Sequence, residues 1–225
     1  KPNYIVKSAL NMELIWCPPG GYFMGPRNKK KGVVVRGFYL GKYEVSQKEY
    51  QKVMGVNRSE FKGEQLPVHK ISWKDAMQFC DMLNKNERIS KFWTFTLPHD
   101  SEWEYACRSG TTTNYSWGNS ISKNLANYSD SGVKKTVEIG SYQPNAWGFY
   151  DMHGNVAEWC NDYFGPYSQD LAIDPQGPVS APDFVRRGGS WFAPLRYVKA
   201  AGRNQGKPDR KERYIGFRVA FKKVD

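Results

Sequence analysis

In the first half of the chain, apolar residues recur with the spacing of amphipathic helices. Ser46 and Glu49 form a capping box that begins a helix, because each side chain can bond the backbone amide of the other residue, and Gly55 ends that helix. Ser72 precedes a longer helix. Its apolar residues follow the i, i+3, i+4 pattern and predict one buried face, formed by Trp73, Ala76, Met77, Cys80 and Leu83.

Three further stretches have a recognisable pattern. Acidic residues crowd the start of 97–110, where the positive end of a helix dipole favours them, and this stretch is the third predicted helix. Residues 13–24 predict two short strands around the turn Pro18-Pro19-Gly20-Gly21, and residues 33–40 predict a single strand. After these stretches the helical pattern stops.

The second half of the chain is rich in turn residues and large rings. The sequence holds 21 Gly and 13 Pro, and 15% of its residues are aromatic, with 8 Trp. Irregular loops cannot pair their backbone groups in ladders, so we expect buried polar contacts or ions to hold them. No internal repeat or low-complexity linker divides the 225 residues, which predicts one domain over 1–225 with low regular secondary structure.

Positive charge is concentrated at the C-terminal end. Residues 186–225 hold 12 Lys and Arg against 3 Asp and Glu, a net charge of +9, whereas the first 185 residues carry only +2. This asymmetry indicates an anionic partner, such as a nucleic acid, an acidic surface or an acidic ligand. The alternative is a solvated face together with arginines that brace loops, because the basic residues alternate with Gly, Pro and acids.

The cysteines and the N-terminus narrow the class of protein. No stretch reaches the roughly 18 apolar residues of a membrane span. Lys1 is not Met and no signal-like apolar run follows it, so we expect a mature chain from which any targeting segment has been removed. The four cysteines predict small core residues, and one or two disulfides stay open as an alternative for a secreted protein; they are Cys17, Cys80, Cys107 and Cys160.

The sequence contains no self-contained catalytic constellation. His69, His99 and His153 are widely spaced and form no metal-binding pair, so each is interpreted as structural. Phe192 stands where a nucleophile elbow built on Gly188-Gly189-Ser190 would need Gly. The glycine-rich phosphate-binding motifs are also missing.

Oxygen-bearing side chains gather in the turn-rich stretch 151–158. Asp151, Asn155 and Glu158, together with free backbone carbonyls, offer the hard oxygen ligands that calcium prefers. The alternative is a turn whose side chains cap its own backbone amides. Both interpretations stay open from the residues alone.

The stretch from Arg186 to Arg218 is the most informative part of the sequence. Small and aromatic residues flank it, and its interior mixes Phe, Tyr, Pro, Arg, Gln and Lys with no helical or strand period. Side chains of Tyr, Phe and Arg give large contact areas and forked donors. An extended exposed surface of this kind therefore suits recognition better than catalysis.

Ten short motifs follow one another along nearly the whole chain. They are Phe23-Met24-Gly25, Tyr43-Glu44-Val45-Ser46, Pro67-Val68-His69 with Ser72-Trp73, Leu97-Pro98 with Glu102-Trp103-Glu104-Tyr105, Trp117-Gly118, Ala126-Asn127, Pro144-Asn145 with Gly148-Phe149-Tyr150-Asp151-Met152, Gly154-Asn155-Val156 with Glu158-Trp159, Arg187-Gly188-Gly189-Ser190-Trp191 and Gly216-Phe217-Arg218. In this order they resemble the formylglycine-generating-enzyme (sulfatase-modifying factor) domain. The resemblance implies an α+β, C-type-lectin-like fold of the formylglycine-generating-enzyme type.

The resemblance does not bring the oxidase activity of the family with it. The oxidase members bind copper through two cysteines shortly after the Gly-Gly-Ser motif, and residues 191–225 contain no cysteine. Thiolates are the ligands that select Cu(I), so that site is absent. The sulfoxide-synthase relatives use an iron-binding histidine triad, which three scattered histidines do not reproduce. We therefore expect a non-enzymatic member without a catalytic cofactor.

Residues 191–214 resemble the hypervariable segment of the variable proteins of diversity-generating retroelements. Trp191, Arg203, Pro208-Asp209 and Ile215-Gly216-Phe217-Arg218 fall on the fixed positions of that pattern. The resemblance implies that the residues between them are diversified and bind the ligand. These fourteen positions are Phe192, Ala193, Pro194, Arg196, Tyr197, Gly202, Asn204, Gln205, Gly206, Lys207, Arg210, Glu212, Arg213 and Tyr214.

The same resemblance implies a calcium site, a location and a partner. The calcium site of the family maps onto Asp151, Gly154, Val156 and Glu158, where the ion would be structural. The location is the cell surface, as an outer-membrane lipoprotein that meets the membrane only through a lipid anchor. We expect an unidentified protein or other macromolecular ligand of acidic character, and no nucleic acid. The competing hypotheses are a metal-dependent oxidase of the same family and a basic nucleic-acid-binding module.

Overall fold

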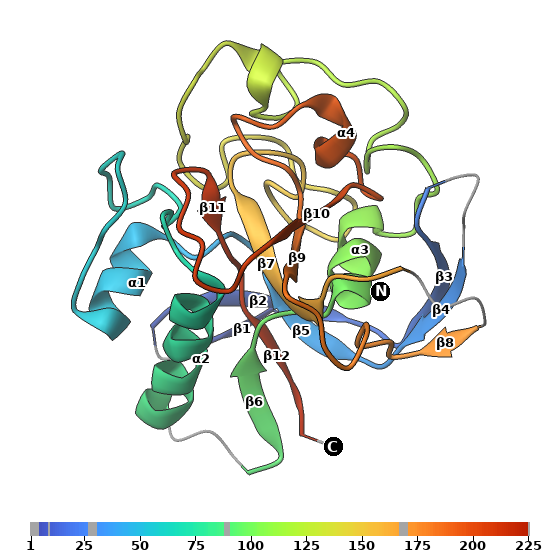
Figure 1. Ribbon diagram of the computed structural model, residues 1–225, viewed down its shortest axis with the longest axis horizontal. Coiled ribbons are helices and arrows are strands. Elements are labelled where there is room, and N and C mark those ends of the chain that lie inside the picture. Colours follow the sequence, from blue (N-terminus) through green and yellow to red (C-terminus); the bar gives the residue numbers. More distant parts are fainter. Residues whose placement is uncertain (1–4, 9, 27–30, 88–90, 167–170, 225) are drawn as a thin grey trace.

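Strands from both ends of the chain meet in a five-stranded antiparallel sheet (Figure 1). The structure is a computed structural model and describes residues 5–8, 10–26, 31–87, 91–166 and 171–224. Across the sheet the strands are β1 (Ile5–Lys7), β2 (Glu13–Cys17), β5 (Phe38–Gly41), β12 (Ala220–Lys223) and β6 (Trp93–Thr96). Strand β12 pairs with both β5 and β6, so the C-terminal strand lies inside the sheet and ties the end of the chain to its beginning.

Two smaller sheets pack beside it. One has the order β10 (Arg203–Gly206), β9 (Phe184–Arg187), β7 (Ala157–Tyr163) and β11 (Ile215–Gly216). The other has the order β3 (Gly20–Met24), β4 (Lys31–Val35) and β8 (Ala172–Ile173). The two strands predicted within 13–24 are confirmed as β2 and β3, although they belong to different sheets.

The single strand predicted over 33–40 is wrong. The chain leaves β4 after Val35 and enters β5 at Phe38, so the apolar run is shared between two sheets. At Gly37, between them, a Cβ atom would lie 2.3 Å from the ring of Trp16. The chain turns here because glycine alone leaves room for that ring, a constraint that the hydrophobic pattern does not contain.

The three predicted helices are confirmed as α1 (Gln47–Met54), α2 (Trp73–Glu87) and α3 (Asp100–Arg108). The Ser46 hydroxyl accepts a hydrogen bond from the Glu49 amide at 3.2 Å, and the Glu49 carboxylate accepts one from the Ser46 amide at 2.7 Å. A 3-10 turn (Ser129–Ser131) and the one-turn helix α4 (Leu195–Val198) were not predicted, because three or four residues are too few to show a period. None of the described helices is long and apolar enough to cross a membrane.

Two large apolar clusters form most of the core of the described residues, and a third, small cluster joins Tyr115, Ala126 and Tyr128 to Val198 of α4. The first joins the inner faces of α1 and α2 to Trp159 and Phe217, and the second joins α3 to the five-stranded sheet around Trp103 and Phe38. All four cysteines are buried free thiols in these clusters, and burial raises the pKa of each. Their prediction as small core residues is confirmed.

Two fully buried arginines hold the irregular loops together. Arg187, at the end of β9, donates to the carboxylates of Asp100 and Glu104, and its Nη1 also donates to the carbonyl oxygens of Ala200 at 2.9 Å and Gly202 at 3.0 Å. Each of these carbonyls lies in a loop that no strand pairs. A guanidinium with five donors can therefore replace the missing ladder hydrogen bonds.

Arg218 plays the same part on the other side of residues 191–214. Its Nε and Nη2 atoms donate to the two oxygens of Glu158 at 2.6 and 2.7 Å. The remaining donors reach the carbonyls of Gly41 and Tyr150, each at 3.0 Å. Both side chains of the ion pair are 0% exposed. The interpretation of some C-terminal arginines as braces for loops is confirmed by these two residues.

The imidazole of His153 fixes a third point. Its Nδ1 atom donates to the carbonyl of Val198 in α4 at 2.7 Å, and Nε2 accepts from the Ser116 amide at 3.1 Å. This pattern requires the neutral ring, since a protonated ring could not accept from Ser116. Burial lowers the pKa of His153 to about 4. The neutral ring thus connects the loop after α3, which contains Ser116, to α4.

The first prediction concerns the buried ion pair. Replacing Arg218 by Met leaves the Glu158 carboxylate buried without its partner, and we expect the free energy of unfolding to fall by about 3–5 kcal/mol. Urea denaturation measures it. The control is Lys48→Met, which removes an exposed ion pair with Glu64 and should leave the denaturation midpoint almost unchanged. Equal losses in the two variants would contradict the bracing role of Arg218.

The second prediction concerns pH. His153 titrates near 6.5 in the unfolded chain and near 4 in the folded one. Between pH 6.5 and about pH 4 only the unfolded state binds the proton. The contribution of the neutral His153 ring to stability is therefore fully present above pH 6.5 and is lost as the pH falls toward 4. We expect His153→Gln, which keeps one donor and one acceptor, to weaken the loss of stability between pH 7 and pH 5. Nitrogen NMR should find the ring neutral at pH 5.5, and a midpoint near 6.5 would refute the assignment.

Candidate ligand-binding surface

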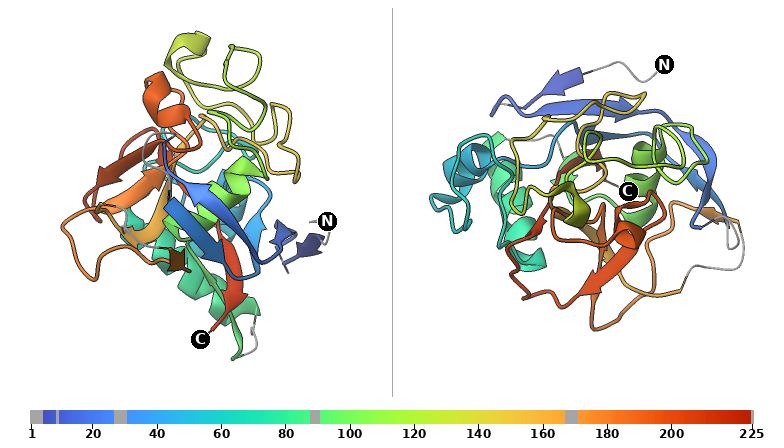
Figure 2. Two further views of the ribbon diagram at one scale, coloured as in Figure 1. Left: turned by 90° about the vertical axis from the view of Figure 1, so that its right-hand side faces the viewer. Right: turned by 90° about the horizontal axis from the view of Figure 1, so that it is seen from above.

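Residues 191–214 leave the buried frame at Trp191, pass through α4 and β10, and return to it at β11. In Figure 1 and in the left view of Figure 2, α4 lies at the end of the molecule opposite the C-terminus. Strand β10 pairs with β9 from Arg203↔Arg187 to Gly206↔Phe184, and β11 pairs in parallel with β7. The segment is therefore attached to the four-stranded sheet at both ends.

The fourteen predicted ligand-binding positions differ in exposure. Seven are exposed, namely Phe192, Pro194, Arg196, Gln205, Lys207, Arg210 and Arg213. Five are half-buried, namely Ala193, Tyr197, Asn204, Glu212 and Tyr214. Two, Gly202 and Gly206, are buried.

The two glycines do not fit the expectation that every position displays a side chain. A Cβ atom at Gly202 would lie 2.5 Å from the carbonyl oxygen of Tyr197, and one at Gly206 would lie 2.9 Å from the ring of Trp159. A larger residue at either position would have to move the α4 loop or the Trp159 ring. These positions shape the backbone under the surface and present nothing to a ligand.

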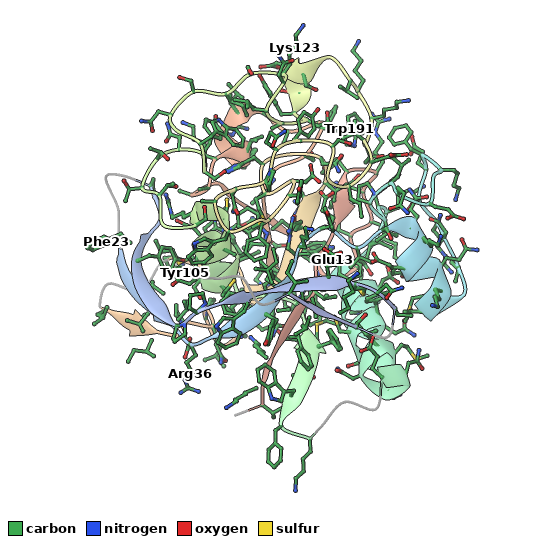
Figure 3. The ribbon with its side chains drawn as sticks, turned by 180° about the vertical axis from the view of Figure 1, so that it is seen from behind. Glu13, Phe23, Arg36, Tyr105, Lys123 and Trp191 are labelled. Carbon is green, nitrogen blue, oxygen red and sulfur yellow. The ribbon has the colours of Figure 1, made fainter. Side chains whose placement is uncertain are left out.

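Aromatic rings and arginines interleave on the exposed side. The rings of Phe192 and Tyr214 stack with centroids 5.6 Å apart, and the guanidinium of Arg213 lies 5.1 Å from the ring of Trp191. Trp191 itself is only 4% exposed, so it supports the surface from below. Figure 3 labels it at the end of the molecule far from Arg36. Stacked rings and cation–π contacts hold this surface in a defined shape before any ligand arrives.

A cavity of about 180 Å³ opens between these rings. Its lining combines the fixed residues Arg186 and Ser190 with the predicted ligand-binding residues Phe192, Tyr197, Asn204 and Tyr214. Arg186 was treated in the sequence only as part of the basic end. Nothing in the sequence distinguished it from Arg187 beside it, whose charge is neutralised by two carboxylates.

Of the predicted calcium ligands, Glu158 already has partners for both of its carboxylate oxygens. Besides Arg218, the Glu158 carboxylate accepts from the indole of Trp103 at 2.7 Å. The Val156 amide donates to Glu44, and Asp151 accepts from the Gly140 amide at 2.6 Å through one oxygen while the other has no partner. Burial raises the pKa of Asp151 to about 6. As placed here, Glu158 is held by a guanidinium and does not fit a calcium ion.

The same stretch cross-links distant loops. Asn155 accepts from the Val137 amide at 3.0 Å and donates to Glu44 at 2.7 Å. These contacts reach other segments, so the side chains of this stretch do more than cap the amides of their own turn. The described residues contain no group of three His, Cys, Asp or Glu suited to a metal ion. Structural calcium at Asp151, Gly154, Val156 and Glu158 stays a prediction.

A second, larger cleft of about 880 Å³ lies elsewhere, lined by Trp16, Tyr39 and Trp93 among others. Two of its cations have carboxylate partners, because Lys222 pairs with Glu102 at 3.1 Å and Arg36 pairs with Asp174 at 3.0 Å. Sequence reasoning did not find this cleft, since its residues come from strands far apart in the chain. We regard the surface of residues 191–214 as the better candidate site, because a buried charged side chain there, Arg186, has no carboxylate partner among the described residues.

The three histidines are far from being a metal triad. His69 accepts from the amides of Glu60 and Phe61 through Nε2, and His99 contacts Asp162 at 3.1 Å through Nδ1. With His153 bonded to Val198, each ring has its own separate partners. The interpretation of all three as structural residues fits these contacts.

Known proteins are similar to this chain in sequence and in fold. The mouse formylglycine-generating enzyme is 31% identical over 172 residues, which cover 68% of this chain and 44% of that enzyme, so the chain spans less than half of its length. The chaperone protein LppX of Paenibacillus barcinonensis is 31% identical, with 77% of each chain covered. The structure of Treponema denticola variable protein 1 superimposes with a TM-score of 0.89 at 27% identity, covering 98% of this chain and 99% of that one.

These similarities agree with the architecture described above. The expected α+β, C-type-lectin-like fold of the formylglycine-generating-enzyme type is confirmed, as is the resemblance to a variable protein. The family model of the sulfatase-modifying factor enzyme 1-like domain matches residues 5–223. The chain therefore belongs to the sulfatase-modifying factor enzyme 1-like family.

Proposed function

We propose that the protein is a non-enzymatic, surface-displayed ligand-binding module in which residues 191–214 are diversified to recognise varied ligands. One observation carries the proposal: the residues at the two ends of the segment are packed in the core, while most of the predicted ligand-binding positions between them are at least partly exposed. Arg187, Trp191 and Arg218 are at most 4% exposed. Twelve of the fourteen predicted positions between Trp191 and Ile215 are exposed or half-buried.

This arrangement suits a binding protein whose specificity changes. Substitutions at exposed positions away from caps and ion pairs usually alter stability by only about 0.5 kcal/mol. The frame would therefore survive many different surfaces. Tyr, Phe and Arg also bind with little loss of side-chain freedom, because stacking already restricts them. Function located on loops above a rigid scaffold follows the same logic.

The structural similarity supports a binding role over a catalytic one. Variable protein 1 of Treponema denticola matches this chain along almost its entire length, whereas the mouse enzyme is matched over less than half of its own. Family membership alone leaves both roles open, since enzymes carry this domain too.

The cysteines also argue against the oxidase hypothesis. Residues 191–225, where the copper-binding members carry their two thiols, contain none. The four thiols that the chain does have are buried, and burial raises the pKa of each, which disfavours the thiolate that Cu(I) needs.

The nucleic-acid hypothesis loses part of its basis. Of the 12 basic residues in 186–225, Arg186, Arg187 and Arg218 are buried. They serve the core and the base of the surface, so the exposed positive field is smaller than the sequence suggests. No nucleic-acid partner belongs to the proposal, and the ligand is an unidentified protein or other macromolecule of acidic character. Display as an outer-membrane lipoprotein, with a lipid anchor as the only membrane contact, rests on the family resemblance.

The third prediction tests diversification directly. Copies of the gene from sibling isolates should differ mainly at the twelve exposed or half-buried positions, and Gly202 and Gly206 should stay glycine because a Cβ atom has no room there. Sequencing measures this. The matched controls are Phe23 and Val179, which are 61% and 99% exposed outside the segment and should differ no more often than the rest of the chain. Differences spread evenly over all exposed positions would sink the proposal.

A further inference from the structure

We propose that Arg186 is a fixed anion anchor at the base of the ligand-binding surface and that it binds a carboxylate of an acidic side chain in a polypeptide ligand. This inference rests on the proposed function and adds the chemistry of the ligand to it. Arg186 lies outside the fourteen diversified positions but lines the same cavity as Phe192, Tyr197 and Tyr214. Proteins that differ at the diversified positions around this cavity would thus share the same anion-binding residue at its base.

Buried arginines in the described residues otherwise have carboxylate partners. Arg108 pairs with Glu104, Arg187 with Asp100 and Glu104, and Arg218 with Glu158. Arg186 is also buried, at 8% exposure, yet it forms no salt bridge with any described carboxylate. A buried charge without a counter-charge is costly, which makes this residue the exception that needs an explanation.

The neighbours of Arg186 leave its charge uncompensated. Its Nη2 atom donates to the carbonyl of Gln205, the guanidinium packs 5.3 Å from the ring of Trp159, and the Tyr214 phenol provides a further hydrogen bond. All three contacts are neutral. The Nε atom is buried without any partner. The Glu212 carboxylate acts on Arg186 through its charge, but its hydrogen-bonded partner is Arg210.

Arg210 increases the effect, because its positive charge lies close enough to lower the pKa of Arg186, although burial is the larger cause. The local sum of Arg186, Arg210 and Glu212 is one positive charge. An incoming carboxylate would neutralise it and could take two parallel hydrogen bonds from the guanidinium. The aromatic rim would exclude water around the pair and so strengthen it.

The size of the cavity favours a small anionic group. A volume of about 180 Å³ accommodates the end of an acidic side chain, while the rest of a macromolecular ligand would spread over the exposed rings. The exposed basic residues of the C-terminal end, such as Arg196, Lys207 and Arg213, would attract the same kind of partner at longer range. Both features point to an acidic polypeptide, and a free sugar acid is the alternative that the test must separate.

The test uses a blocked amino acid as the probe. Titration with N-acetyl-aspartate methylamide should shift the Arg186 Nε signal in nitrogen NMR in a saturable way. The matching asparagine compound has nearly the same shape without the charge and should leave the signal unchanged. Equal responses to the two probes, or no response to either, would overturn the proposal. Tighter binding of glucuronate than of the aspartate probe would overturn the polypeptide assignment.

Variants connect the response to this residue. Arg186→Met should weaken binding of the aspartate probe by about 10-fold or more, whereas Arg36→Met, in the distant larger cleft, should leave it unchanged. Arg186→Met should also unfold at an equal or higher temperature than the parent, because the uncompensated charge is gone. Should it fail to fold, Arg186→Lys keeps the charge without the fork and should bind less tightly. Unchanged affinity in the folded variant would refute the anchor.

The two proposals fail in different ways. The blocked probes can be used without knowing the natural ligand, so a titration without response would refute the anion anchor at Arg186. Variation among gene copies that falls mainly on the predicted positions would still support diversified recognition. Conversely, variation spread uniformly over the chain would refute the proposed diversification. A saturable response at Arg186 would then indicate an anion site with another purpose.

Discussion

The structure depends on two buried guanidinium groups that stand on either side of residues 191–214. Arg187 gathers two carboxylates of α3 and two carbonyls of the α4 loop, and Arg218 gathers Glu158 and carbonyls of two further loops. The irregular half of the chain has few ladder hydrogen bonds, so its backbone needs partners of this kind. The positive charges of Arg187 and Arg218 are tolerated inside the core only because each guanidinium forms hydrogen bonds of good geometry with buried carboxylates.

This bracing separates the frame from the surface. Trp191, Ile215 and Phe217 are packed in the core, as are Val198 and Ala200 within the segment. Twelve of the fourteen predicted ligand-binding positions are exposed or half-buried. A change on the outside therefore need not disturb the braces. Arg186 lies at the boundary, buried like the braces but without their carboxylates, and this difference makes the base of the surface suited to an anionic group.

Much of the frame could be predicted from the sequence because its signals are local. The capping box at Ser46 and the acidic start of α3 involve residues three apart, and the ordered motifs gave the fold. The break at Gly37 could not be predicted, nor could which of the C-terminal arginines act as braces. Both depend on Trp16, Glu104 or Glu158, which meet these residues only in the folded chain. Likewise, the half-buried position of Tyr197 and the burial of Gly202 follow from the path of α4, which has no sequence period.

The central claim is that the exposed positions are independent of the frame that carries them. Its most direct test compares protease resistance in two libraries of equal size. One is randomised at Phe192, Arg196, Gln205 and Arg210, and the other at Arg187, Trp191, Phe217 and Arg218. The account predicts that most members of the first library stay resistant with unchanged denaturation midpoints, and that most of the second are degraded. Similar losses in both libraries would contradict it.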